Sequence, residues 1–227
     1  MPEVQFQGPE GRLQGRYHPA EDSAAPIAIV LSPHPKAGGH MDHRVPVALY
    51  EQFKRRGFSV LRFNFRGVGL SQGEYDNGAG ELQDAAYALD FIQAHNQNAP
   101  FTWVTGYSFG AWIGMQLLMR RPEIIGFTHM SLPVNTYDFA FLAPCPASGL
   151  VVYGTEDSVV PPDDVPRILS KVRTQKGTEI TTYPIEGADH FYKDHFLDEA
   201  VYVLDDYLDV HLPPQYSPPR GPIGIEG

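Results

Sequence analysis

A serine stands between two glycines in the pentapeptide GYSFG, where a strand-like apolar segment meets a buried helical one. A serine on such a tight strand-to-helix turn has a strained backbone that projects its hydroxyl above the sheet. The turn crowds the positions two before and two after the serine, which explains Gly106 and Gly110. The pattern predicts Ser108 as a nucleophile. The backbone N–H of Phe109, at the start of the helix, points to where negative charge would develop.

A serine nucleophile of this kind needs a histidine that a carboxylate orients. In the fold that uses this strand-to-helix turn, the chain order is Ser, acid, His. The segment GLVVYGTEDSVVPP ends a strand and places Asp157 in the following loop, with Glu156 beside it as an alternative acid. The segment TTYPIEGADHFY ends the last strand and places His190 before the final helix. His195, one turn into that helix, is the alternative base. The carboxyl ends of parallel strands meet at one edge of a sheet, so we expect Ser108, Asp157 and His190 to converge there.

Each of these residues also fits a purely structural role. Acids such as Asp157 are common in turns, and Asp189 or His190 could cap a helix. Three such coincidences at matching strand ends are much less frequent than one, and this favours the chemical interpretation.

Several segments together resemble the α/β-hydrolase superfamily over roughly residues 4–210, namely VLSPHPKAGGHMDH, LRFNFRGVGLSQG, GYSFGA, VYGTEDSVVPP and GADHFY. The chain looks like the small bacterial members without a lid that are related to dienelactone hydrolases. The resemblance implies a triad of Ser108, Asp157 and His190, hydrolysis of an ester or similar acyl bond, and no cofactor. Dienelactone hydrolases use a cysteine nucleophile, whereas this turn carries serine, so their substrate does not transfer.

The histidine-rich stretch HPKAGGHMDH follows the buried strand at residues 26–32. In the fold that the chain resembles, this loop supplies the second oxyanion N–H. Pro33 and Pro35 have no N–H to give. We therefore expect the donor to be Lys36, with Ala37 as the alternative.

The same stretch has a competing interpretation as a metal site. The zinc hydrolase run H-x-H-x-D-H would need histidine where Gly38 stands, which leaves His40, Asp42 and His43 as a partial ligand set. No second cluster at a recognisable spacing supplies the missing ligands. Asp42 is expected instead to cap the helix that begins near His43, and no metal is expected.

The connection PVNTYDFAFLAPCPA, which precedes the strand at residues 148–154, is too short for a separate cap domain. We expect its aromatic residues Tyr137 and Phe139, together with His34 and Tyr107, to line an open, shallow substrate pocket. Such a pocket favours short acyl chains. Arg66, in the glycine-rich segment NFRGVGLSQG, fits either a structural ion pair near the site or a solvated surface loop.

Strand-like and helical segments alternate along the chain. An antiparallel hairpin is expected within the first 18 residues. Further strands are expected at 26–32, 58–65, 101–107, 124–132, 148–154 and 178–185, and helices at 43–57, 80–95, 109–122 and 189–212. Alternation of this kind predicts a mostly parallel, twisted sheet with helices on both faces and the hairpin at its N-terminus. Residues 1–212 are read as one α/β domain and residues 213–227 as a Pro/Gly-rich tail.

Composition narrows the function further. The formal net charge is −10 over 227 residues and basic runs are absent, which argues against a nucleic-acid partner. No segment is apolar over a membrane-spanning length, and the N-terminus lacks the pattern of a secretory signal, so a cytoplasmic protein without a membrane partner is expected. The single cysteine, Cys145, is expected in the core. A homodimer is a reasonable expectation from the tail and the aromatic content.

The sequence therefore predicts a serine hydrolase of the carboxylesterase type that acts on a small ester through an acyl-enzyme. One alternative is a hydrolase-fold protein that binds ligands without catalysis. A second is a metal-dependent hydrolase that uses His40, Asp42 and His43. Thioesterase, lactonase or peptidase activity also stays open, because the same triad serves all three.

Overall fold

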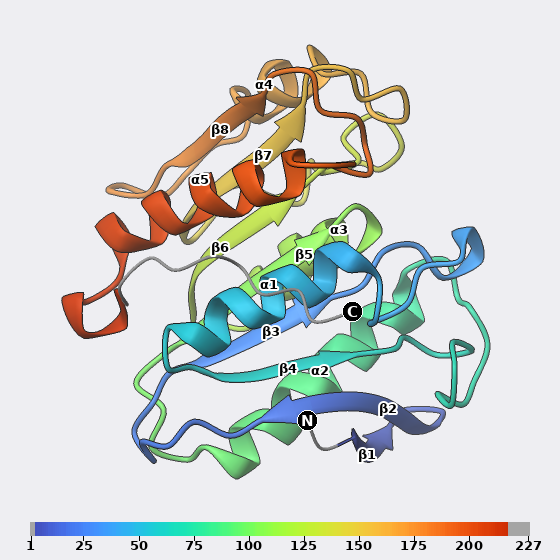
Figure 1. Cartoon of the computed structure of the whole chain (residues 1–227). Helices are drawn as coiled ribbons and strands as arrows, with labels where there is room; N and C mark the ends of the chain where they lie inside the picture. Colours follow the sequence, from blue (N-terminus) through green and yellow to red (C-terminus); the bar gives the residue numbers. More distant parts are fainter. Residues whose placement is uncertain (1–2, 218–227) are drawn as a thin grey trace.

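The computed structural model describes residues 3–217, which form an eight-stranded sheet (Figure 1). The strand order is β1-β2-β4-β3-β5-β6-β7-β8. Strand β1 is antiparallel to β2, β2 is antiparallel to β4, and all other neighbours are parallel. The strands are β1 Glu3–Gly8, β2 Gly11–His18, β3 Ile27–Leu31, β4 Ser59–Phe63, β5 Thr102–Tyr107, β6 Ile124–Met130, β7 Ser148–Gly154 and β8 Ile180–Ile185. The predicted N-terminal hairpin and mostly parallel sheet are confirmed.

Helices cover both faces of the sheet, as expected. Helices α1 and α5 pack on one face, and α2 and α3 pack on the other (Figure 1). Their bounds are α1 Arg44–Arg55, α2 Ala79–His95, α3 Phe109–Leu118, α4 Asp164–Leu169 and α5 Phe196–His211, and short 3₁₀ turns occupy Pro35–Ala37 (η1) and Pro214–Tyr216 (η2). This two-sided cover buries the central strands completely: every residue of β3, β4 and β5 is buried. Strand β8, at the edge, is only partly buried.

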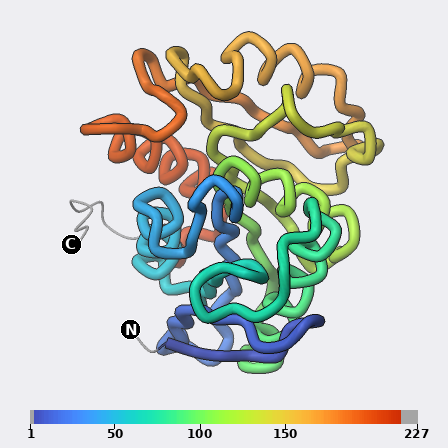
Figure 2. The backbone as a smooth tube through the Cα atoms, turned by 90° about the vertical axis from the view of Figure 1, so that its right-hand side faces the viewer, coloured from blue at the N-terminus to red at the C-terminus, as the bar shows by residue number. Residues whose placement is uncertain are grey.

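The carboxyl ends of the parallel strands, which the predicted site residues follow, lie along one edge of the sheet. Figure 2 looks onto this edge, with the N-terminal hairpin in blue at the bottom and the last α/β units in orange at the top. The loops after β3, β5, β7 and β8 all emerge here. Between β6 and β7 the chain forms only the connection 131–147, so the fold has no cap domain, as predicted.

The final helix begins later than the sequence pattern indicates. It starts at Phe196 instead of near residue 189. Tyr192 and Asp194 adopt left-handed backbone conformations, with φ of 47° and 54°, which a continuous right-handed helix does not allow. His195 is therefore the residue before the helix, not one inside it. Helix α4 was not expected from the sequence.

Contacts with the α/β domain continue after residue 212. The Tyr216 ring packs edge-on against Phe58 and Phe101, at centroid distances of 5.5 and 6.0 Å. The Arg56 guanidinium donates to the Tyr216 carbonyl at 3.0 Å. Residues 218–227 of the predicted tail lie outside the described residues. No helix between residues 3 and 217 is long and apolar enough to cross a membrane.

Candidate active site

Ser108 forms the sharp turn between β5 and α3. Its φ of 54° and ψ of −118° are unusual for a residue with a side chain. The Ser108 N–H donates to the Met130 carbonyl at 2.9 Å, which ties the turn to the neighbouring strand. A Cβ on Gly106 would lie 2.8 Å from the carbonyl carbon of Gly110. The two glycines are therefore a steric requirement of the turn, as their spacing around Ser108 predicts.

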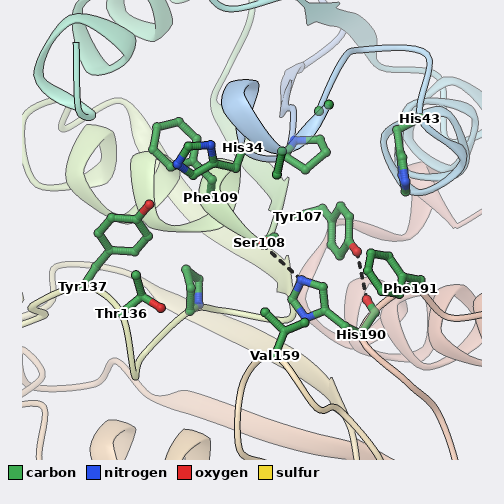
Figure 3. A pocket seen from close by; sticks show the side chains of 15 residues that line it. His34, His43, Tyr107, Ser108, Phe109, Thr136, Tyr137, Val159, His190 and Phe191 are labelled. Carbon is green, nitrogen blue, oxygen red and sulfur yellow. Dashed lines mark hydrogen bonds between the residues drawn. The ribbon is translucent and has the colours of Figure 1, made fainter. Parts of the chain in front are cut away.

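His190 lies in the loop after β8 and faces the serine. Its Nε2 is 3.2 Å from Ser108 Oγ, and the residue is only 5 % exposed. The Tyr107 hydroxyl donates to the His190 carbonyl at 2.8 Å, and the two rings lie 5.5 Å apart (Figure 3). Asp189 holds the same loop by accepting the Phe191 N–H at 3.0 Å. His190 is thus fixed by its backbone as well as by its ring.

Asp157, in the loop after β7, orients the imidazole. Its Oδ2 is 2.7 Å from His190 Nδ1, and its Oδ1 accepts the N–H groups of Val159 and Val160, both at 2.8 Å. Since the carboxylate is an acceptor, Nδ1 carries the proton and Nε2 is left to accept from the Ser108 hydroxyl. The neighbouring Glu156 is exposed, so the loop presents Asp157 and not Glu156 to the histidine.

These residues open into a cavity of about 290 Å³ whose walls are mainly apolar and aromatic (Figure 3). Three of the predicted pocket residues, His34, Tyr107 and Tyr137, line it. The other lining residues are Pro33, Ala37, Gly38, Gly39, His43, Ser108, Phe109, Pro133, Thr136, Val159, His190 and Phe191. Val159 and Phe191 were missed, although each stands within two residues of a predicted triad member.

Phe139 was predicted to line this pocket, and that prediction is wrong. Its side chain is 5 % exposed and belongs to the hydrophobic core on the α2 and α3 side of the sheet. The small hollow that it borders lies against Ile168 and Val172, away from the serine. Tyr137, two residues earlier, instead stacks on Trp112 at 4.0 Å and presents its ring to the pocket.

The loop after β3 is folded by the 3₁₀ turn η1. The Lys36 N–H donates to His34 Nδ1 at 3.1 Å, and the Ala37 N–H donates to the His34 carbonyl at 3.0 Å. Both predicted oxyanion donors in this loop therefore already have acceptors. The Phe109 N–H, in contrast, belongs to the first turn of α3, where N–H groups have no acceptor within the helix.

The structure directs Asp42 away from a metal site. Its carboxylate lies 2.6 Å from Arg62 and 3.5 Å from Arg16. Asp42 was expected to cap α1, and that prediction is wrong. His43 occupies the position before the helix and forms no side-chain cap. His43 stacks on Tyr107 with centroids 5.5 Å apart. Within residues 3–217, no three His, Cys, Asp or Glu side chains gather in a way that could hold a metal ion.

Arg66 and Cys145 both have structural partners. Arg66 is 2 % exposed, donates to both oxygens of the buried Asp84 and pairs with Glu10 at 3.0 Å. The structural ion pair is therefore the correct one of the two interpretations. Cys145 is fully buried, and burial raises the pKa of its thiol, as suits a core residue.

Comparison with known proteins agrees with the fold. Residues 35–144 match the family described as the alpha/beta hydrolase fold. An uncharacterized protein of Rickettsia prowazekii (strain Madrid E) is 49 % identical over 212 residues, which cover 92 % of this chain and 89 % of that protein. A structure from Agrobacterium tumefaciens, of unknown function and classed with the α/β hydrolases, is 53 % identical with a TM-score of 0.90, covering 96 % of this chain and all of that one. An α/β serine hydrolase without a lid from Xanthomonas campestris is 27 % identical with a TM-score of 0.83, covering 93 % and 95 % of the two chains.

Proposed function

The chain belongs to the α/β-hydrolase family, and we propose that it is a serine hydrolase of the carboxylesterase type. The observation that carries the proposal is the line of contacts from Ser108 through His190 to Asp157, at 3.2 and 2.7 Å. Nucleophile, base and orienting acid come from three separate loops. Ser108 and His190 line one cavity, and Asp157 contacts the ring nitrogen of His190 that faces away from the serine, as this chemistry requires.

The geometry supports an acyl-enzyme mechanism. His190 Nε2 takes the proton from Ser108 Oγ as the oxygen attacks an acyl carbonyl, and Asp157 stabilises the imidazolium that forms. Collapse of the tetrahedral intermediate expels the alcohol, which receives the proton from His190. A water molecule, deprotonated by the same histidine, then hydrolyses the acyl-enzyme. The Phe109 N–H, in line with the α3 axis, holds the oxyanion in both steps, with a second donor from the loop after β3.

The cavity favours a compact substrate. Its volume of about 290 Å³ is at the small end for a ligand pocket, and its walls are mainly carbon. Thr136 and Tyr137 lie on one side of the Ser108–His190 pair and His43 and Phe191 on the other, so the ester would lie between them (Figure 3). We therefore propose an ester with a short acyl chain as the substrate class. Thioesters and lactones would use the same machinery.

The two rival functions have less support. A metal-dependent reaction through His40, Asp42 and His43 would have to release Asp42 from two arginines. A non-catalytic binding role gives no reason for the strained backbone of Ser108, which costs free energy unless the projected hydroxyl is used.

Hydrolysis of short p-nitrophenyl esters tests the proposal. The Ser108→Ala variant should lose about 10³-fold or more in kcat, because the three residues act as a unit. The exposed Ser170, at the end of α4, provides the matched Ser170→Ala control, which should retain the activity of the natural protein. Full activity in Ser108→Ala, or a preference for long-chain triglycerides, would contradict the proposal.

A further inference from the structure

One residue, His34, accepts hydrogen bonds from three N–H groups of its own loop. Its ring Nδ1 accepts the Lys36 N–H at 3.1 Å, and its carbonyl accepts the N–H groups of Ala37 and Gly39, both at 3.0 Å. The Gly38 N–H is bonded as well, to the Pro35 carbonyl at 3.2 Å. The fold of this loop therefore depends on the imidazole of His34 as an acceptor.

The second ring nitrogen of His34 contacts a residue outside the loop. His34 Nε2 is 3.1 Å from the Tyr75 hydroxyl, and the ring packs against Phe109 with centroids 4.9 Å apart. Because Nδ1 accepts from Lys36, the neutral ring carries its proton on Nε2 and donates it to Tyr75. The segment that follows Tyr75 is fixed in turn, because the Glu81 carboxylate accepts the N–H groups of Asp76 at 3.0 Å and Gly78 at 2.7 Å. His34 thus ties the loop to the rest of the site.

These bonds leave one candidate for the second oxyanion donor. Pro33 and Pro35 have no N–H, and the next four residues have acceptors within the loop. Among residues 33–39, the His34 N–H is the remaining donor, and it makes no hydrogen bond to any of residues 3–217. The chain just before it is held close to the nucleophile turn, because a Cβ on Gly110 would come within 2.5 Å of the Ser32 carbonyl oxygen.

We propose that the neutral imidazole of His34 is a positioning residue that folds the loop so that the His34 N–H, not that of Lys36 or Ala37, meets the oxyanion. This inference rests on the proposed function. It explains why the earlier candidates are turned into the loop. Catalysis then also requires that the His34 imidazole, which lies outside the triad, be neutral, because a protonated Nδ1 cannot accept the Lys36 N–H.

The surroundings of His34 favour the neutral ring. Burial lowers the pKa of His34, and the Glu81 carboxylate on α2 opposes this more weakly. The other polar groups that face it are the Tyr75 hydroxyl, which accepts from Nε2, and the exposed Lys36 ammonium on the same loop, which lies above the Tyr75 ring. The ring is therefore neutral near pH 7 and takes up a proton only in acid.

Kinetics of His34→Ala and His34→Asn test the positioning role. Loss of one oxyanion donor costs about 10²- to 10³-fold in kcat, so His34→Ala should approach that loss while KM changes little. The asparagine amide oxygen can accept the Lys36 N–H, so His34→Asn should recover most of the activity. If Lys36 is the true donor, His34→Ala frees its N–H and is as active as the natural protein or faster, which would overturn the inference. An inactive Ser108→Ala in the same assay shows that the proposed function stands in that case.

The pH profile gives a second test, which does not need the alanine variant to fold. Two rings, those of His34 and His190, must be neutral in the natural protein. The acid limb of its log(kcat/KM) should therefore be steeper than that of His34→Asn, in which only the His190 ring has to stay neutral. Equal acid limbs in the two proteins would rule out a role for the protonation of His34.

Discussion

The carboxyl edge of the sheet and the layer directly beneath it are built in opposite ways. At the edge, Ser108 and Tyr192 have left-handed backbones, with φ of 54° and 47°, and polar side chains face a cavity. Beneath it, Gly106, Gly110 and Gly114 are packed so closely that a Cβ on any of them would meet atoms within 3 Å. The strained backbone at the edge therefore keeps its geometry because the close packing below leaves no room for it to relax.

Two histidines, one in each layer, differ in the same way in their hydrogen-bond partners. His190, at the edge, has Asp157 on one ring nitrogen and Ser108 on the other. His129, on β6 below, is fully buried, and neither ring nitrogen has a hydrogen-bond partner within residues 3–217. Burial lowers the pKa of His129 to about 3. The same side chain thus contacts a carboxylate and a hydroxyl in one layer and is a neutral packing group in the other.

Removing the acid at the edge should have the largest effect. In Asp157→Asn the amide cannot hold the Nδ1–H tautomer of His190 in the same way, so kcat should fall by about 10³- to 10⁴-fold. The adjacent, exposed Glu156 provides the control, and Glu156→Gln should stay within about twofold of the natural protein. A larger loss in Glu156→Gln than in Asp157→Asn would reverse the assignment of the acid.

Filling the packed layer should cost stability. In Gly110→Ala the new methyl group would overlap the backbone carbonyl of Leu31, which cannot swing aside as a flexible side chain can. We expect the free energy of unfolding in urea to fall by about 3 kcal/mol, with activity falling as well.

The matched control for Gly110→Ala is Gly57→Ala, after α1. Gly57 has a φ of 78° and no atoms within 4 Å of its Cβ position, so this change measures backbone strain alone. A loss of about 1 kcal/mol is expected, with activity retained. If Gly110→Ala proved no more costly than Gly57→Ala, the layer beneath the site would have room to relax.

The smallest expected effect is the contribution of His129 to the pH dependence of the free energy of unfolding. The pKa of His129 in the folded state is well below its ordinary value of 6.5, so between pH 6.5 and about 3 the unfolded chain binds a proton that the folded chain does not. Stability conferred by neutral His129 is therefore complete above pH 6.5 and falls as the pH drops, by about 1.4 kcal/mol per unit. Urea unfolding at pH 6.5 and 5.5 should show a shallower decline in His129→Leu. Equal declines would mean that His129 is not desolvated as described.

The sequence was sufficient for the parts of the site that depend on residue type and strand order. Ser108 and Asp157 each follow a strongly apolar strand, His190 follows the more polar edge strand, and parallel strands bring such positions to one edge. The glycine spacing around Ser108 has a steric cause that can be derived without coordinates. The sheet and its helices follow from the same alternation of patterns.

The sequence was not sufficient where local hydrogen bonds choose between neighbours. Nothing in the residue order shows that His34 accepts the Lys36 N–H, so the oxyanion loop was assigned by excluding prolines alone. Phe139 and Tyr137 are similar aromatic residues two positions apart, and only the packing against Trp112 separates them. The start of α5 depends on the left-handed residues Tyr192 and Asp194, which carry no sequence signal for that conformation.

Covalent labelling with a fluorophosphonate tests most directly whether the edge of the sheet is a working nucleophile site. Intact mass and peptide mapping should find one adduct per chain, on Ser108. Within residues 3–217, this is the only hydroxyl that lies near the Nε2 of a histidine oriented by a carboxylate, at 3.2 Å. Labelling should be absent in Ser108→Ala and much slower in Asp157→Asn. An unmodified Ser108 in a protein that hydrolyses esters, or an adduct on another residue, would contradict the account.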